Sequence, residues 1–322
     1  TTLLKSLALA MAEQVGPGDE LVVTRVDHEA NIGCWLDLAK TRGATVRFWE
    51  RNTVTGQLST EDLQALLTDR TRLVSVTHVS NIFGSIHPIE EIASRVHACG
   101  AELCVDGVAF APHRPLQLAA WGVDYYVFSL YKVYGPHHAI LYGRHDALIA
   151  LGNLNHHFFT REQVPGKLEP GNANYELAHG AAGIVDYFER LGQRADAALE
   201  GAPARDKAWQ WIAAHEETLS SRLLTYLDNR PDVEVLGSTQ ADAEIRVPTV
   251  SFVHASKRSS EIVAAIDAFG IGIRFGHFYA ERLIADMGLV DRDGVVRVSM
   301  VHYNTLAEVD RLLQAFDAVL GA

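Results

Sequence analysis

The sequence predicts an α/β domain with a mostly parallel sheet, followed by a smaller C-terminal α+β domain. Between residues 20 and 144, short runs of β-branched residues alternate with amphipathic segments, which is typical of a parallel sheet covered by helices. The alternation stops near residue 150, where a long segment rich in Gly, Pro and Asn begins. We therefore expect a large domain at residues 1–195 and a small domain at residues 196–322.

The elements expected in the large domain follow from this alternation and from helix-end signals. Ser59 and Thr60 are capping residues for one helix, and Pro88 opens another at its first turn. A helix-like segment begins the chain at Thr1 rather than at Met, so we expect the first part of this domain to be missing. Strands are predicted at residues 20–25, 44–50, 72–78, 102–106, 124–129 and 139–144, and helices at residues 30–42, 59–67 and 88–99.

The rest of the chain begins with the irregular segment at residues 150–172, of the kind that usually carries function. Near the C-terminus, Thr305 and Glu308 form a T-x-x-E capping box. Helices are predicted at residues 173–191, 203–228, 259–269 and 305–320, and strands at residues 245–253, 271–276 and 295–301.

Composition narrows the class of protein. The 322 residues are 48% hydrophobic, enough for a substantial core, and the net charge of −12 argues against nucleic-acid and anionic-membrane surfaces. No apolar run approaches the roughly 18 residues that span a bilayer. The three cysteines form no CxxC pair and no signal peptide is evident, so we expect a reducing cytoplasm and small-molecule chemistry.

Polar side chains follow the predicted strands at their carboxyl ends, where ligands bind in open α/β sheets. His78 and Asn81 follow one strand, Asp106 ends the next, and Ser129 and Lys132 follow another. We expect these groups to converge. Asp106 is either a turn cap in VDGVA or the counter-charge of a cation, and that cation is either Lys132 or a bound pyridinium nitrogen.

Lys132 is either a salt-bridged lysine or an amine whose pKa is lowered by an apolar pocket, able to form a Schiff base. A strand-end Asp followed about 26 residues later by Ser-x-x-Lys and Gly-Pro is the arrangement that pyridoxal phosphate needs, with Ser129 as a phosphate ligand. Arg297, in the apolar strand VVRVSMV, either pairs internally or binds a substrate carboxylate. Arg274 is a second, weaker candidate for that role.

Seven segments, in the same order, resemble the class V aminotransferase family of pyridoxal-phosphate enzymes, and within it the cysteine desulfurase-like branch. The segments are VDHEAN (26–31), THVSNIFGSIHPIEEI (77–92), VDGVAFAPHRP (105–115), FSLYKVYGP (128–136), LEPGNAN (168–174), IRFGHFYA (273–280) and RVSMVHYNTLAEVDRL (297–312).

The resemblance implies a fold-type I enzyme with a seven-stranded, mainly parallel sheet, and a homodimer whose active sites lie between subunits. It implies that Lys132 forms the Schiff base with the cofactor, that Asp106 pairs with its pyridinium, and that Asn81 lies near its ring and the substrate carboxylate. Thr2 and Ser129 would bind phosphate. The remaining implied roles are for Asn172, which would reach the neighbouring subunit's phosphate, and Arg297, which would bind the substrate's α-carboxylate.

Four positions depart from the family pattern. Glu29 stands where the family has a ring-stacking histidine, which leaves His28 as the candidate substitute. Ala109 replaces a glutamine that would bind the ring hydroxyl, and Tyr131 replaces a histidine while keeping a donor for phosphate. On the loop beginning at Arg274, Tyr279 stands where a group of desulfurases has the persulfide-forming cysteine, and a phenol cannot accept sulfur in this way.

The function expected from these residues is that of a pyridoxal-phosphate enzyme acting on a small α-amino acid, a desulfurase-like carbon–sulfur lyase without the standard catalytic cysteine. We read Cys34, Cys99 and Cys104 as structural, and we expect no metal. One alternative is an aminotransferase or epimerase in which Tyr279 is an acid–base group. A second alternative is a non-catalytic protein that keeps the cofactor fold.

Overall fold

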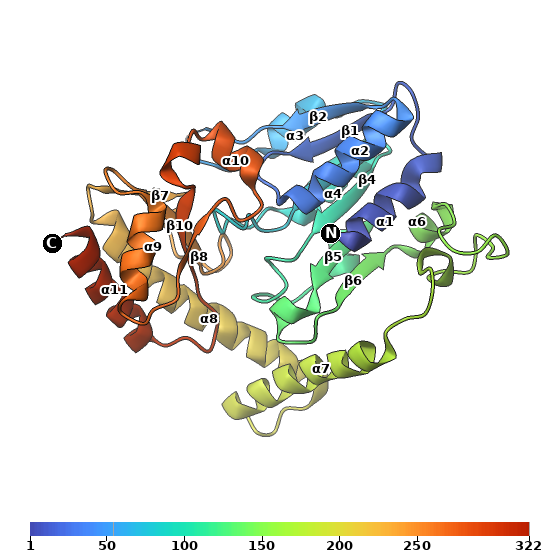
Figure 1. The fold of residues 1–322 in the computed structure, drawn as a ribbon. Helices are drawn as coiled ribbons and strands as arrows, with labels where there is room; N and C mark the ends of the chain where they lie inside the picture. Colours follow the sequence, from blue (N-terminus) through green and yellow to red (C-terminus); the bar gives the residue numbers. More distant parts are fainter. Residues whose placement is uncertain (54, 322) are drawn as a thin grey trace.

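The computed structural model describes residues 1–53 and 55–321, which form two sheets with helices packed on them (Figure 1). The larger sheet has the strand order β2-β1-β3-β4-β5-β6. Its first five strands in this order run parallel, and β6 runs antiparallel to β5. The strands are β1 (Glu20–Thr24), β2 (Thr45–Trp49), β3 (Thr71–Thr77), β4 (Glu102–Asp106), β5 (Tyr125–Ser129) and β6 (Ala139–Gly143).

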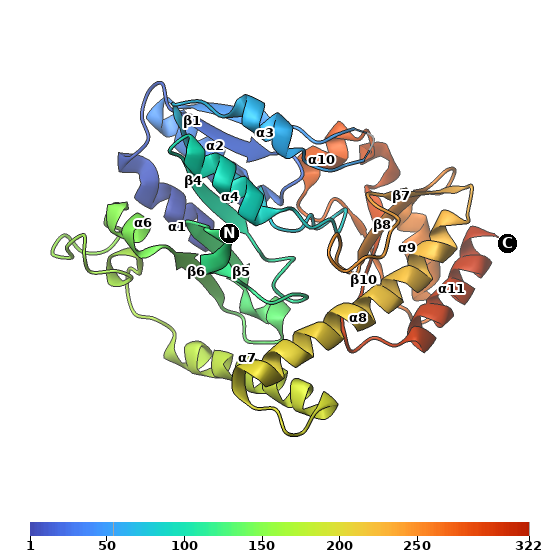
Figure 2. The same ribbon diagram turned by 180° about the vertical axis from the view of Figure 1, so that it is seen from behind.

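Helices cover both faces of this sheet because its strands are apolar on both faces. In β1, Leu21 and Val23 pack with the helices α1 and α2, whereas Val22 between them packs with α3 and α4 on the other face. Figures 1 and 2 show the two faces in turn. The helices of this part are α1 (Thr2–Ala10), α2 (Gly33–Arg42), α3 (Thr60–Leu66), α4 (Ile89–Ala98), α5 (Leu118–Trp121) and α6 (His145–Ala150).

The second sheet is antiparallel, with the order β7-β8-β10-β9. Helices α8, α9 and α11 supply its apolar core, and the long helix α8 passes from this core to the neighbouring helix α7 (Figure 2). The strands are β7 (Val233–Leu236), β8 (Thr249–His254), β9 (Arg274–Gly276) and β10 (Val295–Ser299). The helices are α7 (Tyr175–Ala195), α8 (Gly201–Asp228), α9 (Ser259–Asp267), α10 (Glu281–Asp286) and α11 (Leu306–Leu320).

The predicted α/β class is confirmed, but the expectation of seven strands in the large sheet is wrong for the described residues, where six strands pair. The outer edge of β6 has no partner strand in residues 1–53 and 55–321, so the sheet ends there. The short strand β7 was not predicted, and the strand expected from residue 245 begins only at Thr249, because residues 245–247 turn to pair with the 84–86 segment. The domain boundary at residues 195 and 196 stays a prediction.

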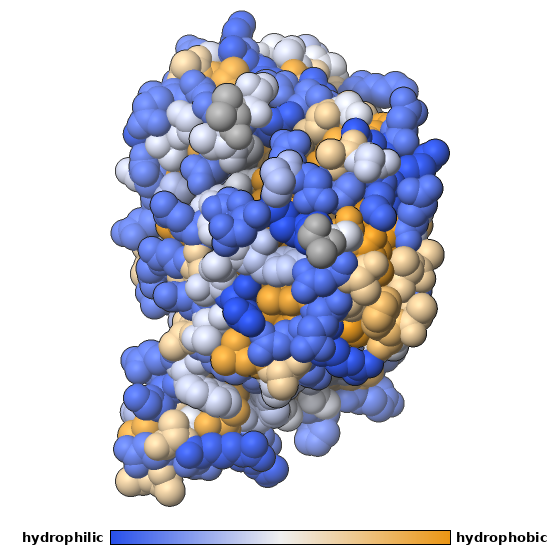
Figure 3. Space-filling view, turned by 90° about the vertical axis from the view of Figure 1, so that its left-hand side faces the viewer, coloured by the Kyte–Doolittle hydropathy of each residue, from blue (hydrophilic) through white to orange (hydrophobic). Residues whose placement is uncertain are grey.

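The outer surface at the small-sheet end is predominantly hydrophilic, with apolar residues in small areas between charged ones (Figure 3). This is the ordinary appearance of a solvent-facing surface. In the part of the chain that the structure describes, no helix is both long enough and apolar enough to cross a membrane.

Candidate active site

A cavity of about 280 Å³ lies at the carboxyl ends of β3, β4 and β5, as expected for an open α/β sheet. A second cavity of about 500 Å³ adjoins it toward β10 and shares Asn81, Ala109, Tyr131 and Lys132 with it. The structure therefore brings most of the predicted site together. The predicted residues that line the first cavity are His28, Asn81, Asp106, Ala109, Ser129, Tyr131 and Lys132.

Lys132 lies in the 3₁₀ turn Leu130–Val133 that follows β5. The turn closes tightly: Tyr134 has a φ of 64°, and a Cβ on Gly135 would lie 2.4 Å from Ile184 Cδ1. The Lys132 side chain is exposed because it projects into the open cavity, yet the protein atoms around it lower its pKa by desolvation. Asp106 opposes this pKa shift and Arg297 adds to it. The result is an ammonium that loses its proton more easily than a free lysine.

Asp106 ends β4 as a buried carboxylate. Its Oδ1 accepts a hydrogen bond of 2.9 Å from the Val108 amide, and burial raises its pKa while that bond and Lys132 lower it. Within the described residues it forms no salt bridge. Gly107 is required beside it because a Cβ there would lie 2.0 Å from the Tyr126 ring. A buried carboxylate of this kind is stabilised by a cationic ligand atom in the cavity.

His28, and not Glu29, faces the first cavity. The His28 ring stacks on Tyr279 with 5.0 Å between centroids, and its Nδ1 accepts a hydrogen bond from the Ala30 amide. Burial, followed by the positive charge of Lys132, lowers the pKa of His28 to about 4, so the imidazole is neutral at physiological pH. Glu29, at the family's ring-stacking position, lines neither cavity, and its carboxylate forms an ion pair with Arg282, so a cofactor-binding role for Glu29 stays a prediction.

Arg297 projects from β10 into the second cavity. Its Nη1 donates to the Asn81 carbonyl at 3.0 Å, and its guanidinium carbon lies 3.7 Å from the centre of the Phe278 ring. Burial lowers its pKa to about 10, which leaves it charged at neutral pH. Asn81 also donates from Nδ2 to the Phe278 carbonyl at 2.8 Å, while its own Oδ1 is buried and has no hydrogen-bond partner among residues 1–53 and 55–321. This orphaned oxygen points to a missing donor in the cavity.

Five predicted residues line neither cavity: Thr2, Glu29, Asn172, Arg274 and Tyr279. Thr2 is exposed on α1, and Thr1 lines the first cavity instead, because the helix begins at Thr2 and turns its side chain outward. Asn172 is exposed in the segment before α7, and its contact with another subunit stays a prediction. Arg274 is exposed on β9, opposite Arg297 in the sheet register, and its Nη1 donates to its neighbouring Ile273 carbonyl.

Sequence reasoning missed three residues that shape the site. Thr1 and Thr77 line the first cavity, and Phe278 covers the Arg297 guanidinium. Thr77 precedes the predicted His78 and ends β3, so its place at a strand's carboxyl end was a usable signal. Nothing in the sequence pattern links Phe278, which lies in a turn after β9, to the Arg297 guanidinium on β10. His78 itself is buried against Phe110 and hydrogen-bonds Tyr126 outside the cavity.

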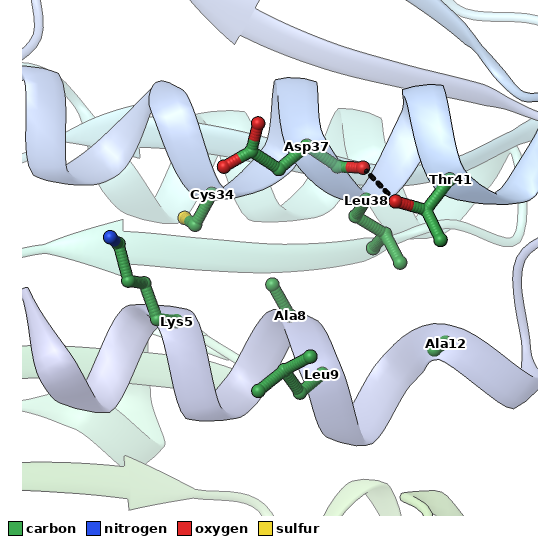
Figure 4. Close-up of a pocket in the computed structure, with 8 residues that line it drawn as sticks. All are labelled: Lys5, Ala8, Leu9, Ala12, Cys34, Asp37, Leu38 and Thr41. Carbon is green, nitrogen blue, oxygen red and sulfur yellow. Dashed lines mark hydrogen bonds between the residues drawn. The ribbon is translucent and has the colours of Figure 1, made fainter.

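In the part of the chain that the structure describes, neither the cysteines nor the groove between α1 and α2 forms a second candidate catalytic site. Cys34, Cys99 and Cys104 are free, and none of the described residues lining the two cavities is a cysteine. Cys34 lies in a groove between α1 and α2, lined by Ala8 and Leu9 of the first helix and by Leu38 of the second (Figure 4). Burial raises the pKa of Cys34 to about 12, so it stays a thiol. Among residues 1–53 and 55–321, no group of three or more acidic, His or Cys side chains is arranged to hold a metal.

Pyridoxal phosphate fits these residues. Asp106, a buried carboxylate without a salt bridge in the described chain, suits its pyridinium nitrogen, and Asn81 Oδ1, which has no donor among the described residues, can accept a hydrogen bond from a bound group. Lys132, exposed to the cavity with a lowered pKa, is the amine that its aldehyde requires. Neutral His28 offers an aromatic face on the same cavity.

Comparison with known proteins agrees with this chemistry. A family model described as aminotransferase class-V matches residues 1–312. The aminotransferase-like protein FGM3 of Gibberella zeae is 44% identical over 324 residues, covering 99% of this chain and 77% of that protein. The cysteine desulfurase-like protein ustD of Aspergillus flavus is 34% identical over 330 residues, covering 99% of this chain and 72% of that protein.

A solved structure shows the same fold. The cysteine desulfurase CsdA of Escherichia coli superposes with a TM-score of 0.83 at 26% identity, covering 99% of this chain and 77% of that one. The chain therefore belongs to the class V aminotransferase family, and it is a pyridoxal-phosphate-dependent transferase or lyase.

Proposed function

We propose that this enzyme acts on a small α-amino acid as a desulfurase-like carbon–sulfur lyase, without a persulfide-forming cysteine on the 274–279 loop. One observation carries the proposal: Lys132, Asp106 and Arg297 border two adjoining cavities that share Asn81 and Lys132. An amine, a buried carboxylate and a guanidinium in this arrangement can hold the cofactor and the carboxylate of an amino acid together.

Lys132 is proposed to hold the cofactor covalently and, once released, to take and return the proton at the substrate's α-carbon. Its lowered pKa suits both tasks, because the amine must be unprotonated to attack and to act as a base. When bound, pyridoxal phosphate supplies an electron sink that stabilises negative charge at that carbon. Asp106 keeps the pyridine nitrogen protonated, and this pairing offsets the cost of burying its charge.

The other side chains around the first cavity are assigned to cofactor binding. His28 packs its neutral ring beside the cofactor, and Ser129 and Tyr131 donate to the phosphate. Thr2, in the first turn of α1, contributes through the helix N-terminus rather than by facing the cavity, and Asn172 of a second subunit completes the phosphate site. Ala109, which has no polar side-chain atom, leaves the ring hydroxyl without a partner at this position.

Arg297 is proposed to bind the substrate's α-carboxylate by a bidentate contact. Phe278 covers one face of the guanidinium and Asn81 occupies one Nη1 donor, so the remaining donors are available on the cavity side. Holding the carboxylate there places the α-carbon toward Lys132, which lines the same cavity. Arg274 lies outside this cavity and is assigned at most a secondary electrostatic role.

The carbon–sulfur assignment is supported by the desulfurase-like relatives and by the loop that carries Tyr279. A phenol at this position cannot store sulfur as a persulfide, so sulfur would leave as sulfide by elimination or pass to a free thiol that acts as acceptor. Tyr279 also supports an aminotransferase or epimerase as the second candidate, because its ring stacks on His28 and a phenol hydroxyl can act as an acid–base group. We further propose a homodimer in a reducing, cytoplasmic compartment, acting on a small amino acid and not on nucleic acid or membranes.

The test is a panel of amino acids added to the cofactor-loaded protein while the visible spectrum and products are recorded. The lyase proposal predicts spectral change with a sulfur-bearing amino acid and release of sulfide, or of alanine when an added thiol accepts the sulfur. Formation of a keto acid from an amino donor would favour the aminotransferase instead. If no α-amino acid changes the visible spectrum of the cofactor-loaded protein, the proposal is contradicted.

A further inference from the structure

The Glu29 side chain ties the 277–282 segment to the chain next to His28. Its Oε2 accepts from Arg282 Nε at 2.8 Å and its Oε1 from Arg282 Nη2 at 2.9 Å, although the two residues lie 253 positions apart. Its backbone amide donates to the Tyr279 carbonyl at 2.8 Å. Gly33 leaves room for this carboxylate, since a Cβ there would lie 3.1 Å from Oε1. Glu29 therefore holds the C-terminal side of a short loop.

The loop at residues 277–280 does not favour its observed shape by itself. Phe278 and Tyr279 have φ values of 50° and 62°, a conformation that residues with a Cβ adopt at a cost. Contacts on its two sides hold it in place. On one side, Asn81 donates a hydrogen bond to the Phe278 carbonyl. On the other side, the Glu29 carboxylate forms an ion pair with Arg282, and the Glu29 amide donates to the Tyr279 carbonyl.

Each of the two residues held in this way contacts a residue that lines one of the two cavities. Tyr279 stacks on His28, which lines the first cavity, and Phe278 lies on Arg297, which lines the second. Beyond the loop, Leu283 and Ile284 anchor α10 in the core of the large sheet, so a change at Arg282 acts on the loop and not on the seating of the helix.

We propose that Glu29 and Arg282 are positioning residues, a pair that holds the 277–280 loop closed over the site so that Tyr279 lies on His28 and Phe278 on Arg297. This inference rests on the proposed function, because it takes Arg297 as the carboxylate-binding residue. The substrate then enters when the pair separates and is retained when it re-forms. Glu29 thus acts through the loop and does not touch the reacting atoms.

The Glu29–Arg282 ion pair is weak enough for the 277–280 loop to open and close reversibly. The Arg282 and Glu29 side chains keep 36% and 41% of their surfaces exposed, so water screens the interaction. An exposed ion pair of this kind shifts an equilibrium by a factor of about two to five. Its loss should raise the open fraction of the loop by that factor without unfolding the protein.

The first experiment compares E29Q with E50Q in the cofactor-loaded protein. Glu50 also contacts an arginine through both oxygens, at 2.9 and 3.1 Å from Arg25 Nε, but lies outside both cavities. We expect E29Q to raise KM for the reactive amino acid about two- to fivefold with kcat nearly unchanged, because closure contributes to retention of the substrate. E50Q should change neither value.

The second experiment measures backbone hydrogen exchange of residues 277–282, which needs no substrate. E29Q should speed this exchange by about the same two- to fivefold, and the charge-reversed variant E29R/R282E should return it toward the wild-type rate. Equal exchange in E29Q and E50Q would overturn the proposal, as would a fall in kcat with KM and exchange unchanged. If no amino acid reacts, the proposed function fails but the exchange result still decides whether the pair holds the loop.

Discussion

At the residue scale, the most direct prediction concerns the catalytic role of Lys132. It is the one lysine lining the two cavities in the described chain, and desolvation lowers its pKa beside Asp106. Lys132→Ala should lose the visible absorbance of the covalently held cofactor and reduce turnover by about a hundred- to ten-thousandfold, the usual contribution of a positioned acid–base group. The matched control is Lys40→Ala on the exposed face of α2, which should keep both. A coloured and active Lys132→Ala protein would contradict the assignment.

Asp27 gives a second test at this scale, through stability and pH. Its carboxylate is buried beside Asp106 and hydrogen-bonded by Thr24 and Asn31, and burial raises its pKa from 3.8 to about 7. Between these two values the folded protein keeps a proton that the unfolded chain has lost. The stability contributed by this proton is complete below pH 3.8 and is lost as the pH rises through about 7.

Asp27→Asn removes this titration, so its stability relative to the wild type should be higher at pH 8 than at pH 5. Urea unfolding of the cofactor-loaded proteins at the two pH values measures the difference. The control is Asp69→Asn at an exposed position, which should show a much smaller change between the two pH values. An equal difference at both pH values for Asp27→Asn would show that the carboxylate does not titrate in this range.

At the element scale, Glu216 fastens α8 to the segment that follows β4. Its two oxygens accept from His113 Nδ1 at 2.9 Å and Arg114 Nη1 at 2.8 Å, and the side chain is fully buried. Glu216→Ala leaves a buried guanidinium without its charge partner, so the free energy of unfolding should fall by about 3–5 kcal/mol. Thermal or urea unfolding measures this loss.

Glu216→Gln should be milder, because an amide still accepts a hydrogen bond from Arg114. Gln210→Ala, at an exposed position on the same helix, should stay within about 0.5 kcal/mol of the wild type. If Glu216→Ala is no less stable than Gln210→Ala, the buried ion pair does not hold α8 in place. Because His113 also lines the second cavity, the loss should weaken substrate binding as well.

At the scale of the whole molecule, the proposed homodimer explains surfaces that a monomer leaves open. On α7, Tyr175 is 71% exposed and Val185 49% exposed, and Asn172 lies just before that helix. Large apolar side chains gathered on one element are typical of an interface with another chain. We therefore expect two subunits per particle in sedimentation and a shared phosphate site between them.

Subunit mixing tests this sharing. A Lys132→Ala homodimer should be inactive and an Asn172→Ala homodimer should bind the cofactor weakly. In a mixed dimer, one site takes Lys132 from one subunit and Asn172 from the other, both intact, so activity should recover to about half that of the wild type per mixed particle. No recovery in mixed dimers whose formation is confirmed would contradict the placement of Asn172 across the interface.

Much of the architecture is readable from local patterns. The alternation of short β-branched runs with amphipathic segments is a local property, and it predicts the parallel sheet and the places where strands end. Asp106, Ser129 and Lys132 were found because ligands bind at strand carboxyl ends, whatever the remainder of the fold does. The capping box at Thr305 and Glu308 likewise depends on residues three apart, and both of its hydrogen bonds form.

The tertiary structure decided what depends on contacts between distant segments. Whether Glu29 faces the cavity depends on Arg282, 253 positions away, and whether Arg297 is covered depends on Phe278 and Asn81. The sequence alone determined the fold class, the family resemblance and the chemistry of the strand-end residues, because these follow from local periodicity and motif order. Side-chain direction, the loop over His28 and the six-stranded extent of the sheet required the folded chain, since packing and ion pairing between remote residues set them.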